Sequence, residues 1–163
     1  MQTFDAAQTR AALPFERLVP ALHRAFVDGA EVPPRHVHAL DGGTVLIMPA
    51  WQRGYLGIKT INIFPGNAAR GLPGLFATYL LYDAHTGEPL AQIDGNEITA
   101  RRTAAASALA ASLLARADAT RLLVLGRGRV GSLLPEAYRS VPGSRTHPLL
   151  CIPGFGAGCF PGE

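Results

Sequence analysis

The sequence predicts an α+β fold, in which helices lie beside a mainly antiparallel sheet, followed by one strand, a glycine-rich loop and a helix. Three observations predict this order. Apolar residues recur at helical spacing in the first thirty residues, short strand-like runs fill residues 35–94, and an apolar strand leads into a glycine motif at residues 126–131. With 163 residues, the chain is long enough for one domain with a core or for pieces of two.

The composition excludes several classes of protein. Hydrophobic residues at 48% and charged residues at 17% are too apolar a mixture for a disordered chain. No apolar run reaches the roughly 18 residues needed to cross a membrane, and the N-terminus lacks a secretory signal, so we expect a cytoplasmic protein with no membrane partner. The net charge is +3, but the arginines form no basic stripe, so we expect no nucleic-acid partner.

Two segments are predicted as helices. In the first thirty residues, Pro14 suits a first helical turn, and Leu18, Leu22 and Phe26 recur at three-to-four spacing before Gly29 ends the pattern. The second segment, residues 96–116, is rich in alanine and has leucines along one side.

Residues 35–94 are predicted as strands joined by short turns. A turn at residues 41–43 joins a strand at 36–40 to one at 44–48. The later runs cover residues 55–64, 76–82 and 89–93, the last two joined by a turn at 83–87. Because consecutive strands with short connections are antiparallel neighbours, the sheet is predicted to be largely antiparallel.

Three basic residues are candidates for chemistry. Lys59 is the only lysine and lies inside an apolar strand, where an amine can lose its proton and an arginine cannot. Arg101 and Arg102 lie near the start of the second predicted helix, where the helix dipole disfavours cations. Either these arginines are solvated, or at least one of them faces a bound carboxylate or phosphate.

The glycine motif predicts a dinucleotide-binding loop of the Rossmann type. Gly126 permits the tight turn after the strand, Gly128 lets the backbone approach a pyrophosphate, and Gly131 lets the following helix pack closely. Pro135 in that helix removes a hydrogen bond and is expected to kink it.

The residues after this unit do not fit the pattern of a complete dinucleotide-binding domain. Such a domain needs a second strand with an acidic residue about 20 positions beyond the glycines for the ribose, or an arginine nearby for a 2′-phosphate. No carboxylate occurs between Glu136 and Glu163. Residues 142–163 are rich in Pro and Gly, which break regular structure. We therefore expect an irregular segment here and a cofactor domain cut off after its first βα unit.

No metal site is expected. His36 and His38 would share one face of a strand, but no carboxylate or thiol at matching spacing accompanies them. Cys151 and Cys159 match neither a redox pair nor a zinc pattern.

Several blocks of the sequence resemble the ornithine cyclodeaminase/μ-crystallin family. They occur in order over residues 1 to about 140 and are PPRHVH (33–38), LIMPAW (46–51), GIK (57–59), FPGN (64–67), RGLP (70–73), DG (94–95) and TARRTAAAS (99–107). Within the family, the first two blocks are most similar to bacterial Δ1-pyrroline-2-carboxylate reductases.

The resemblance implies a domain organisation. Residues 1–117 would belong to a substrate-binding and dimerisation domain, residues 118–141 to the start of a Rossmann domain that binds NAD or NADP, and residues 142–163 to a tail unrelated to the family. It also implies a homodimer.

The resemblance also implies site residues. Arg35 and Lys59 match positions that hold the substrate's carboxylate and its reacting nitrogen, with Lys59 as the catalytic residue, and Arg102 matches one that contacts substrate and cofactor. The positions that match cofactor contacts are Thr78, Arg102, Gly126, Gly128, Arg129, Val130 and Gly131. Arg127 replaces the small residue usual between the first two glycines.

Three functions are compatible with the resemblance. The first is reduction of a cyclic imino acid, Δ1-pyrroline-2-carboxylate, to L-proline with NAD(P)H. The second is cyclodeamination of L-ornithine to L-proline and ammonia with NAD+, and the third is non-catalytic binding of NAD(P)H and a small ligand. The family's catalytic aspartate has no counterpart in these 163 residues, so we expect this chain to lack turnover by itself.

Overall fold

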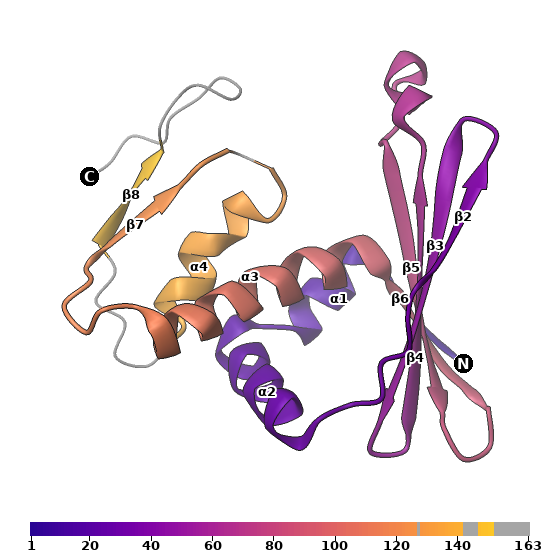
Figure 1. Cartoon of the computed structure of the whole chain (residues 1–163), viewed down its shortest axis with the longest axis horizontal. Helices are drawn as coiled ribbons and strands as arrows, with labels where there is room; N and C mark the ends of the chain where they lie inside the picture. The colour runs from indigo at the N-terminus through magenta and orange to yellow at the C-terminus, as the bar shows by residue number, and fades with distance from the viewer. Residues whose placement is uncertain (127, 142–146, 152–163) are drawn as a thin grey trace. The chain divides into compact units, whose positions relative to one another are not determined.

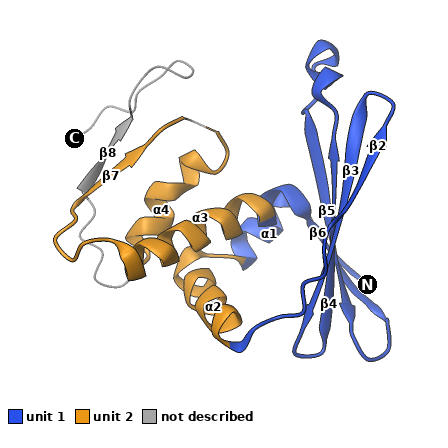
Figure 2. Ribbon diagram, viewed as in Figure 1, with its two compact units in different colours: residues 1–12, 28–98 blue, residues 13–27, 99–163 orange. Residues whose placement is uncertain are grey.

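The computed structural model describes residues 1–126, 128–141 and 147–151, the last of these for the backbone alone. The chain divides into two compact units (Figure 2). Unit 1 consists of Met1–Ala12 and Asp28–Ile98, and unit 2 consists of Leu13–Val27 and the chain from Thr99 onward.

Unit 1 contains a six-stranded sheet in the order β1-β6-β5-β4-β3-β2 (Figure 1). All neighbours are antiparallel except β1 and β6, so the prediction of a largely antiparallel sheet is confirmed. The strands are β1 (Gln2–Phe4), β2 (His36–Leu40), β3 (Gly43–Gln52), β4 (Tyr55–Ile63), β5 (Leu75–Asp83) and β6 (Pro89–Asp94).

Local turn chemistry sets the register of these strands. Arg53 and Gly54 both have positive φ angles, 50° and 79°, and form the two-residue turn between β3 and β4. In the β5–β6 turn, the Asp83 carboxylate accepts hydrogen bonds of 2.8 Å from the backbone N–H groups of His85 and Thr86. These bonds, that from Thr86 first, lower the pKa of Asp83.

The N-terminal residues differ from the predicted helix. The helices here are α1 (Ala6–Ala12) and α2 (Phe15–Asp28), and Gln2–Phe4 form β1, parallel to β6. Asp5 explains the boundary, because its carboxylate accepts from the Gln8 N–H at 2.8 Å and its own N–H donates to the Gln8 side chain at 3.0 Å. This reciprocal cap starts α1 after Asp5 and leaves the preceding residues to pair as a strand.

The long helix α3 (Gly95–Leu114) matches the second predicted helix. Asp94 caps it by accepting a 2.6 Å hydrogen bond from the backbone N–H of Glu97. Gly95 is required here, since a Cβ would lie 2.5 Å from the backbone carbon of Ala77. No helix among the described residues is long and apolar enough to cross a membrane.

Unit 2 has a small core that α2, α3 and α4 (Leu134–Arg139) share. It consists of Phe15, Val19, Ala104, Ala105, Ala108, Leu109 and Ala137.

Arg101 lies inside this unit and not on its surface. Its side chain is 3% exposed, its guanidinium lies 4.1 Å from the centre of the Phe15 ring, and it donates to the Leu13 carbonyl at 2.7 Å and to Glu136 at 3.3 Å. Both sequence interpretations are wrong for this residue, which is neither solvated nor directed at a ligand. The helix dipole acts only within the first turn of the helix, whereas the groups that bind Arg101 are distant in sequence.

The C-terminal part also departs from prediction in two ways. The strand β7 (Arg121–Val124) pairs in parallel with β8 (His147–Cys151), so the expectations of an irregular segment and of a single βα unit are wrong for residues 147–151. The other residues of 142–163 lie outside the described range. Pro135 does not kink α4, because it lies in the first turn, after a 3-10 turn η2 (Gly131–Leu133), where its missing N–H costs no hydrogen bond.

Replacing Arg101 tests the packing of unit 2. Arg101→Met is expected to lower the free energy of unfolding by about 2 kcal/mol, because the Leu13 carbonyl loses a charged donor. The matched control is Arg102→Met, whose side chain is exposed and whose loss is expected to stay within about 0.5 kcal/mol. Urea denaturation followed by circular dichroism measures the free energy of unfolding of both variants. Equal losses would contradict the buried, hydrogen-bonded position of Arg101.

Candidate functional site

The site is organised around Lys59, whose residue is 9% exposed. Lys59 lies in β4, a central strand of the sheet, paired with Met48 on β3 and with Tyr79 on β5. An edge-strand lysine could extend its side chain into water, but a lysine in this position has its stem covered from both sides.

The sheet positions next to Lys59 on its own face carry no charge. Side chains alternate between the two faces, so the residues next to Lys59 on its own face can be taken from the register. They are Met48 and Tyr79 opposite, Gly57 and Ile61 along β4, and Leu46, Ala50, Ala77 and Leu81 on the diagonals. An ammonium group on such a surface is well suited to hold an anionic ligand, because little water competes for it.

Arg35 is the second cation near this part of the sheet. It directly precedes β2, where His36 pairs with Ile47. Continuing that register by one residue places Arg35 opposite Met48, which itself pairs with Lys59. The two cationic residues are therefore two strands apart, roughly 10 Å between backbones, a distance that two long side chains can bridge around a small molecule. Arg35 is exposed, and no ion pair joins it to Glu31 among the described residues.

Tyr79 lies in one row with Met48 and Lys59, which are paired across strands β3, β4 and β5. Burial raises the pKa of its phenol above the ordinary value of 10.0, so the hydroxyl stays protonated near neutral pH. The ring lies over Gly57, where a Cβ would be 1.9 Å from the Tyr79 hydroxyl oxygen. Gly57 is thus a glycine because the phenol occupies the space that a side chain would need.

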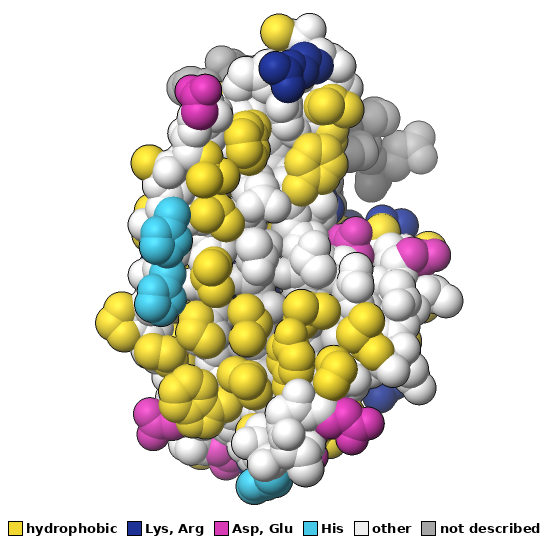
Figure 3. Space-filling view, turned by 90° about the vertical axis from the view of Figure 1, so that its right-hand side faces the viewer, with side chains coloured by type: hydrophobic (Ala, Val, Ile, Leu, Met, Phe, Trp, Pro, Cys, Tyr) yellow, Lys and Arg dark blue, Asp and Glu magenta, His cyan; other side chains and the backbone are white. Residues whose placement is uncertain are grey.

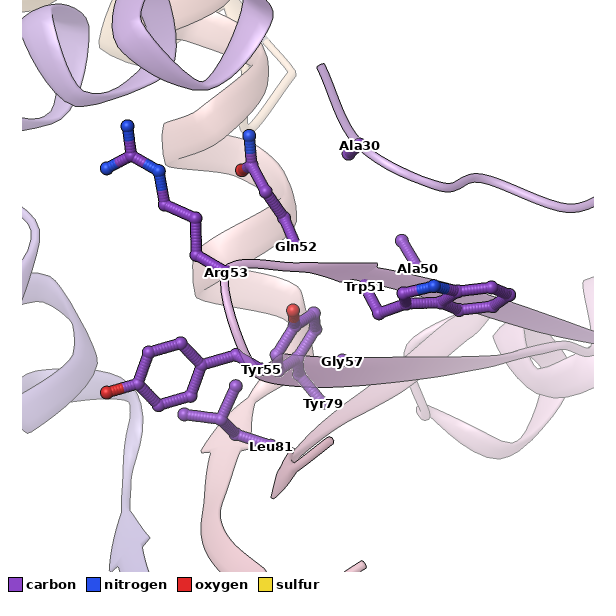
Figure 4. A pocket seen from close by; sticks show the side chains of 9 residues that line it. All are labelled: Ala30, Ala50, Trp51, Gln52, Arg53, Tyr55, Gly57, Tyr79 and Leu81. Atoms are coloured by element: carbon purple, nitrogen blue, oxygen red, sulfur yellow. The ribbon is translucent and has the colours of Figure 1, made fainter. Parts of the chain in front are cut away.

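A pocket of about 550 Å³ opens beside this row (Figure 4). Its lining consists of Ala30, Ala50, Trp51, Gln52, Arg53, Tyr55, Gly57, Tyr79 and Leu81. In Figure 4, the hydroxyl end of Tyr79 points to the side of β4 on which Gln52 lies. The side of the pocket formed by Ala30 is fixed by the next residue, Glu31. The Glu31 N–H donates to the Trp51 carbonyl and the Glu31 carbonyl accepts from the Trp51 N–H, both at 3.0 Å. Arg53 adds an ion pair to Asp28.

Two of the residues that the family resemblance singled out lie elsewhere. Thr78 pairs with Thr60, so its exposed side chain is on the sheet face opposite Lys59. Arg102 is exposed on α3, in unit 2. The cofactor contact implied for Thr78 and the substrate contact implied for Arg102 stay predictions.

The glycine loop fits a dinucleotide. Gly126 has a φ angle of 95°, which favours glycine, and a Cβ at Gly131 would lie 3.0 Å from the Gly126 carbonyl oxygen, so the turn and the close packing are as predicted. A Cβ at Gly128 would meet nothing within 4 Å, so its backbone is open to a phosphate. Arg129 is exposed and Val130 half-buried, while Arg127 lies outside the described residues.

The opposite face of the sheet is an exposed apolar surface (Figure 3). Ile47, Trp51 and Phe76 are 36–43% exposed there. His36 and His38 stack at its edge with ring centres 6.4 Å apart. Within the described ranges, no group of three or more His, Cys, Asp or Glu side chains could hold a metal ion.

Comparison with protein families identifies the chain. The model of the ornithine cyclodeaminase/mu-crystallin family matches residues 6–146, which is most of the sequence. The chain belongs to this family. The blocks around Arg35, Lys59, Arg102 and the glycine loop all fall within the matched range.

Two relatives show how much of a family member is present. An uncharacterized protein of Schizosaccharomyces pombe is 47% identical over 76% of this chain and 40% of its own length. The Δ1-pyrroline-2-carboxylate reductase of Colwellia psychrerythraea is 37% identical over 86% of this chain and 47% of its own length. The chain therefore spans less than half the length of these two relatives.

Solved structures of family relatives share the fold. The Thermococcus litoralis Δ1-pyrroline-2-carboxylate reductase in complex with NADH and L-proline has a TM-score of 0.82, at 30% identity over 93% of this chain and 49% of that one. An archaeal alanine dehydrogenase dimer with bound NAD has a TM-score of 0.81, at 30% identity over 88% and 46%. A lysine cyclodeaminase has a TM-score of 0.77, at 30% identity over 93% and 49%.

Sequence reasoning selected Lys59 and Arg35 but missed Tyr79. The signal for Lys59 was its being the only lysine of the chain. Tyr79 gives no local signal, because its position across from Lys59 and over Gly57 depends on the β4–β5 register.

A substitution at Gly57 tests the contact with Tyr79. Gly57→Ala is expected to lower the free energy of unfolding by about 1–2 kcal/mol, because the new methyl group overlaps the phenol. The same change in a Tyr79→Val background is expected to cost at least about 0.5 kcal/mol less. Gly66→Ala is the control, since a Cβ there meets nothing within 4 Å. Chemical denaturation measures all variants, and equal costs in both backgrounds would contradict the contact.

Proposed function

We propose that this protein is an NAD(P)-dependent reductase that converts a small cyclic imino acid, Δ1-pyrroline-2-carboxylate, to L-proline. The observation that carries the proposal is Lys59, a residue 9% exposed in a central strand whose neighbouring sheet positions on the same face are uncharged, with Arg35 directly before β2. Support comes from the family, from the reductase of Colwellia psychrerythraea and from the Thermococcus litoralis reductase that binds NADH and L-proline.

The proposed roles follow from the substrate's chemistry. Arg35 binds the carboxylate with two parallel hydrogen bonds, for which a guanidinium is suited. Lys59 donates to the ring nitrogen, and Arg102 is the third cation of the proposed site. A protonated or hydrogen-bonded imine has a more electrophilic carbon, so the Lys59 ammonium promotes reduction at the neighbouring atom and supplies the proton that the product nitrogen gains.

The glycine loop would hold the cofactor. Gly126, Gly128, Arg129, Val130 and Gly131 are the proposed contacts with the pyrophosphate. NADH or NADPH, when bound, supplies the hydride that the imine carbon accepts. In this proposal, residues 1–117 bind substrate, residues 118–141 begin the cofactor domain, and Thr78 is a further cofactor contact.

The surroundings of Lys59 favour a reductase over a cyclodeaminase. Ornithine and lysine carry a second ammonium group, which needs a carboxylate partner when it is taken out of water. None of the sheet positions next to Lys59 on its own face holds one. A cyclic imino acid has no second ammonium, so it fits this face better.

A homodimer is the second part of the proposal. The apolar face opposite Lys59, with Ile47, Trp51 and Phe76 exposed, is a suitable surface for a second copy of the chain. The alanine dehydrogenase of similar fold is a dimer. A monodisperse monomer in light scattering would contradict this part.

Ligand binding and turnover test the proposed function. The purified chain is expected to bind L-proline in calorimetry. Lys59→Met is expected to weaken binding tenfold or more, because the Lys59 amine that remains after proton donation accepts a hydrogen bond from the charged proline nitrogen, and a hydrogen bond to a charged group contributes about 1.5–3 kcal/mol. Arg70→Met, an exposed cation of the same unit, is the control and is expected to bind as the wild type does.

Two assays distinguish the possible activities. A reductase oxidises NAD(P)H only when Δ1-pyrroline-2-carboxylate is added, and a cyclodeaminase releases ammonia from ornithine with NAD+. Ammonia release would overturn the proposal. Because this chain is expected to lack turnover by itself, binding without either reaction is also the result expected for a reductase and does not favour the carrier function. That this chain has no turnover by itself stays a prediction, which the first assay also tests.

A further inference from the structure

We propose that Tyr79 determines the size of ring that the Lys59 site accepts, by forming a rigid aromatic wall on its β5 side. This inference rests on the proposed function and names the residue that makes its site prefer a five-membered over a six-membered ring. Tyr79 does not act on the reacting atoms.

The position of Tyr79 follows from the sheet register. Tyr79 is directly opposite Lys59, and residues paired in this way have Cβ atoms about 5 Å apart. A ring held at the Lys59 ammonium is therefore flanked by Met48 on the β3 side and by Tyr79 on the β5 side. The two flanks differ in stiffness, because a methionine has three rotatable bonds and adapts its shape, whereas a phenol ring does not.

The close packing of the phenol ring over Gly57 fixes the ring in place. Its hydroxyl oxygen and its Cζ atom would lie 1.9 and 2.6 Å from a Cβ at position 57, so the ring crosses β4 over the residue two positions before Lys59. The ring also lines the pocket that continues towards Ala50 and Trp51. The phenol thus fills the space over Gly57, which lines the pocket and is next to Lys59 on the same face of β4, so removing the phenol would extend the pocket towards Lys59.

The wall acts through its volume and not through its hydroxyl. One methylene distinguishes a six-membered from a five-membered ring, and a site that excludes one methylene discriminates by about tenfold or more. Removing the phenol opens the site to the pocket and so admits the larger ring. Removing only the hydroxyl leaves the aromatic ring over Gly57 and keeps the discrimination.

Calorimetric binding of L-proline and L-pipecolate to the purified chain tests this inference. The wild type is expected to prefer L-proline, and Tyr79→Val is expected to raise the pipecolate-to-proline affinity ratio by about tenfold. Tyr79→Phe is expected to keep the wild-type ratio. Tyr82→Val is the matched control, since Tyr82 lies on the same strand but on the opposite face, paired with Leu56.

The results distinguish failure of the proposed function from failure of the inference about Tyr79. If the wild type binds neither amino acid, the proposed function and this inference both fail. If it binds L-proline but Tyr79→Val leaves the ratio unchanged, or Tyr79→Phe changes it as much as Tyr79→Val does, the inference alone is overturned. Circular dichroism checks folding, and Tyr79→Leu, which is smaller than the phenol but retains an apolar contact with Gly57, replaces Tyr79→Val if that variant does not fold.

Discussion

The burial of Lys59 in a central strand is the constraint on which the rest of the site depends. A charge buried in a central strand is costly unless charged or polar groups stabilise it, and the neighbouring positions on its sheet face offer only uncharged side chains. Such a group interacts strongly with any small anion that reaches it, because little water is present to screen the attraction. The antiparallel sheet supplies the rigid surface that keeps Lys59, Arg35 and Tyr79 in one row.

The family fold and the local geometry contribute different parts of the account. Membership of the ornithine cyclodeaminase/mu-crystallin family accounts for the sheet and the glycine loop and leaves several reactions open. Among the described sheet positions next to Lys59 on its own face, none holds a carboxylate, and this supports the proposed reductase over a cyclodeaminase, whose substrate has a second ammonium. In our proposal, Tyr79 and Gly57 restrict the choice of substrate further, because the phenol ring packed over Gly57 limits the space beside the reacting nitrogen.

The sequence predicted features whose causes are local and missed those whose causes are distant. The hairpins with turns at residues 41–43 and 83–87 and most of α3 were predicted, because turn residues and an alanine-rich run with leucines along one side act over a few positions. The strand β1 was missed, because Gln2–Phe4 pair with a strand almost ninety residues away. Arg101 was misassigned for the same reason, since Phe15 and Glu136 hold it. Lys59 was found by composition alone, and its row with Arg35 and Tyr79 required the register.

The methyl group of Met48 offers the most direct measurement of the central claim. Met48 lies between Arg35 and Lys59 in their row, and the chain has only one other methionine, Met1. In a carbon-13 methyl NMR titration of the chain with L-proline, the Met48 signal is expected to shift in a saturable way while the Met1 signal stays fixed. A Met48 signal that does not move at saturating L-proline would show that no ligand lies between these two cations.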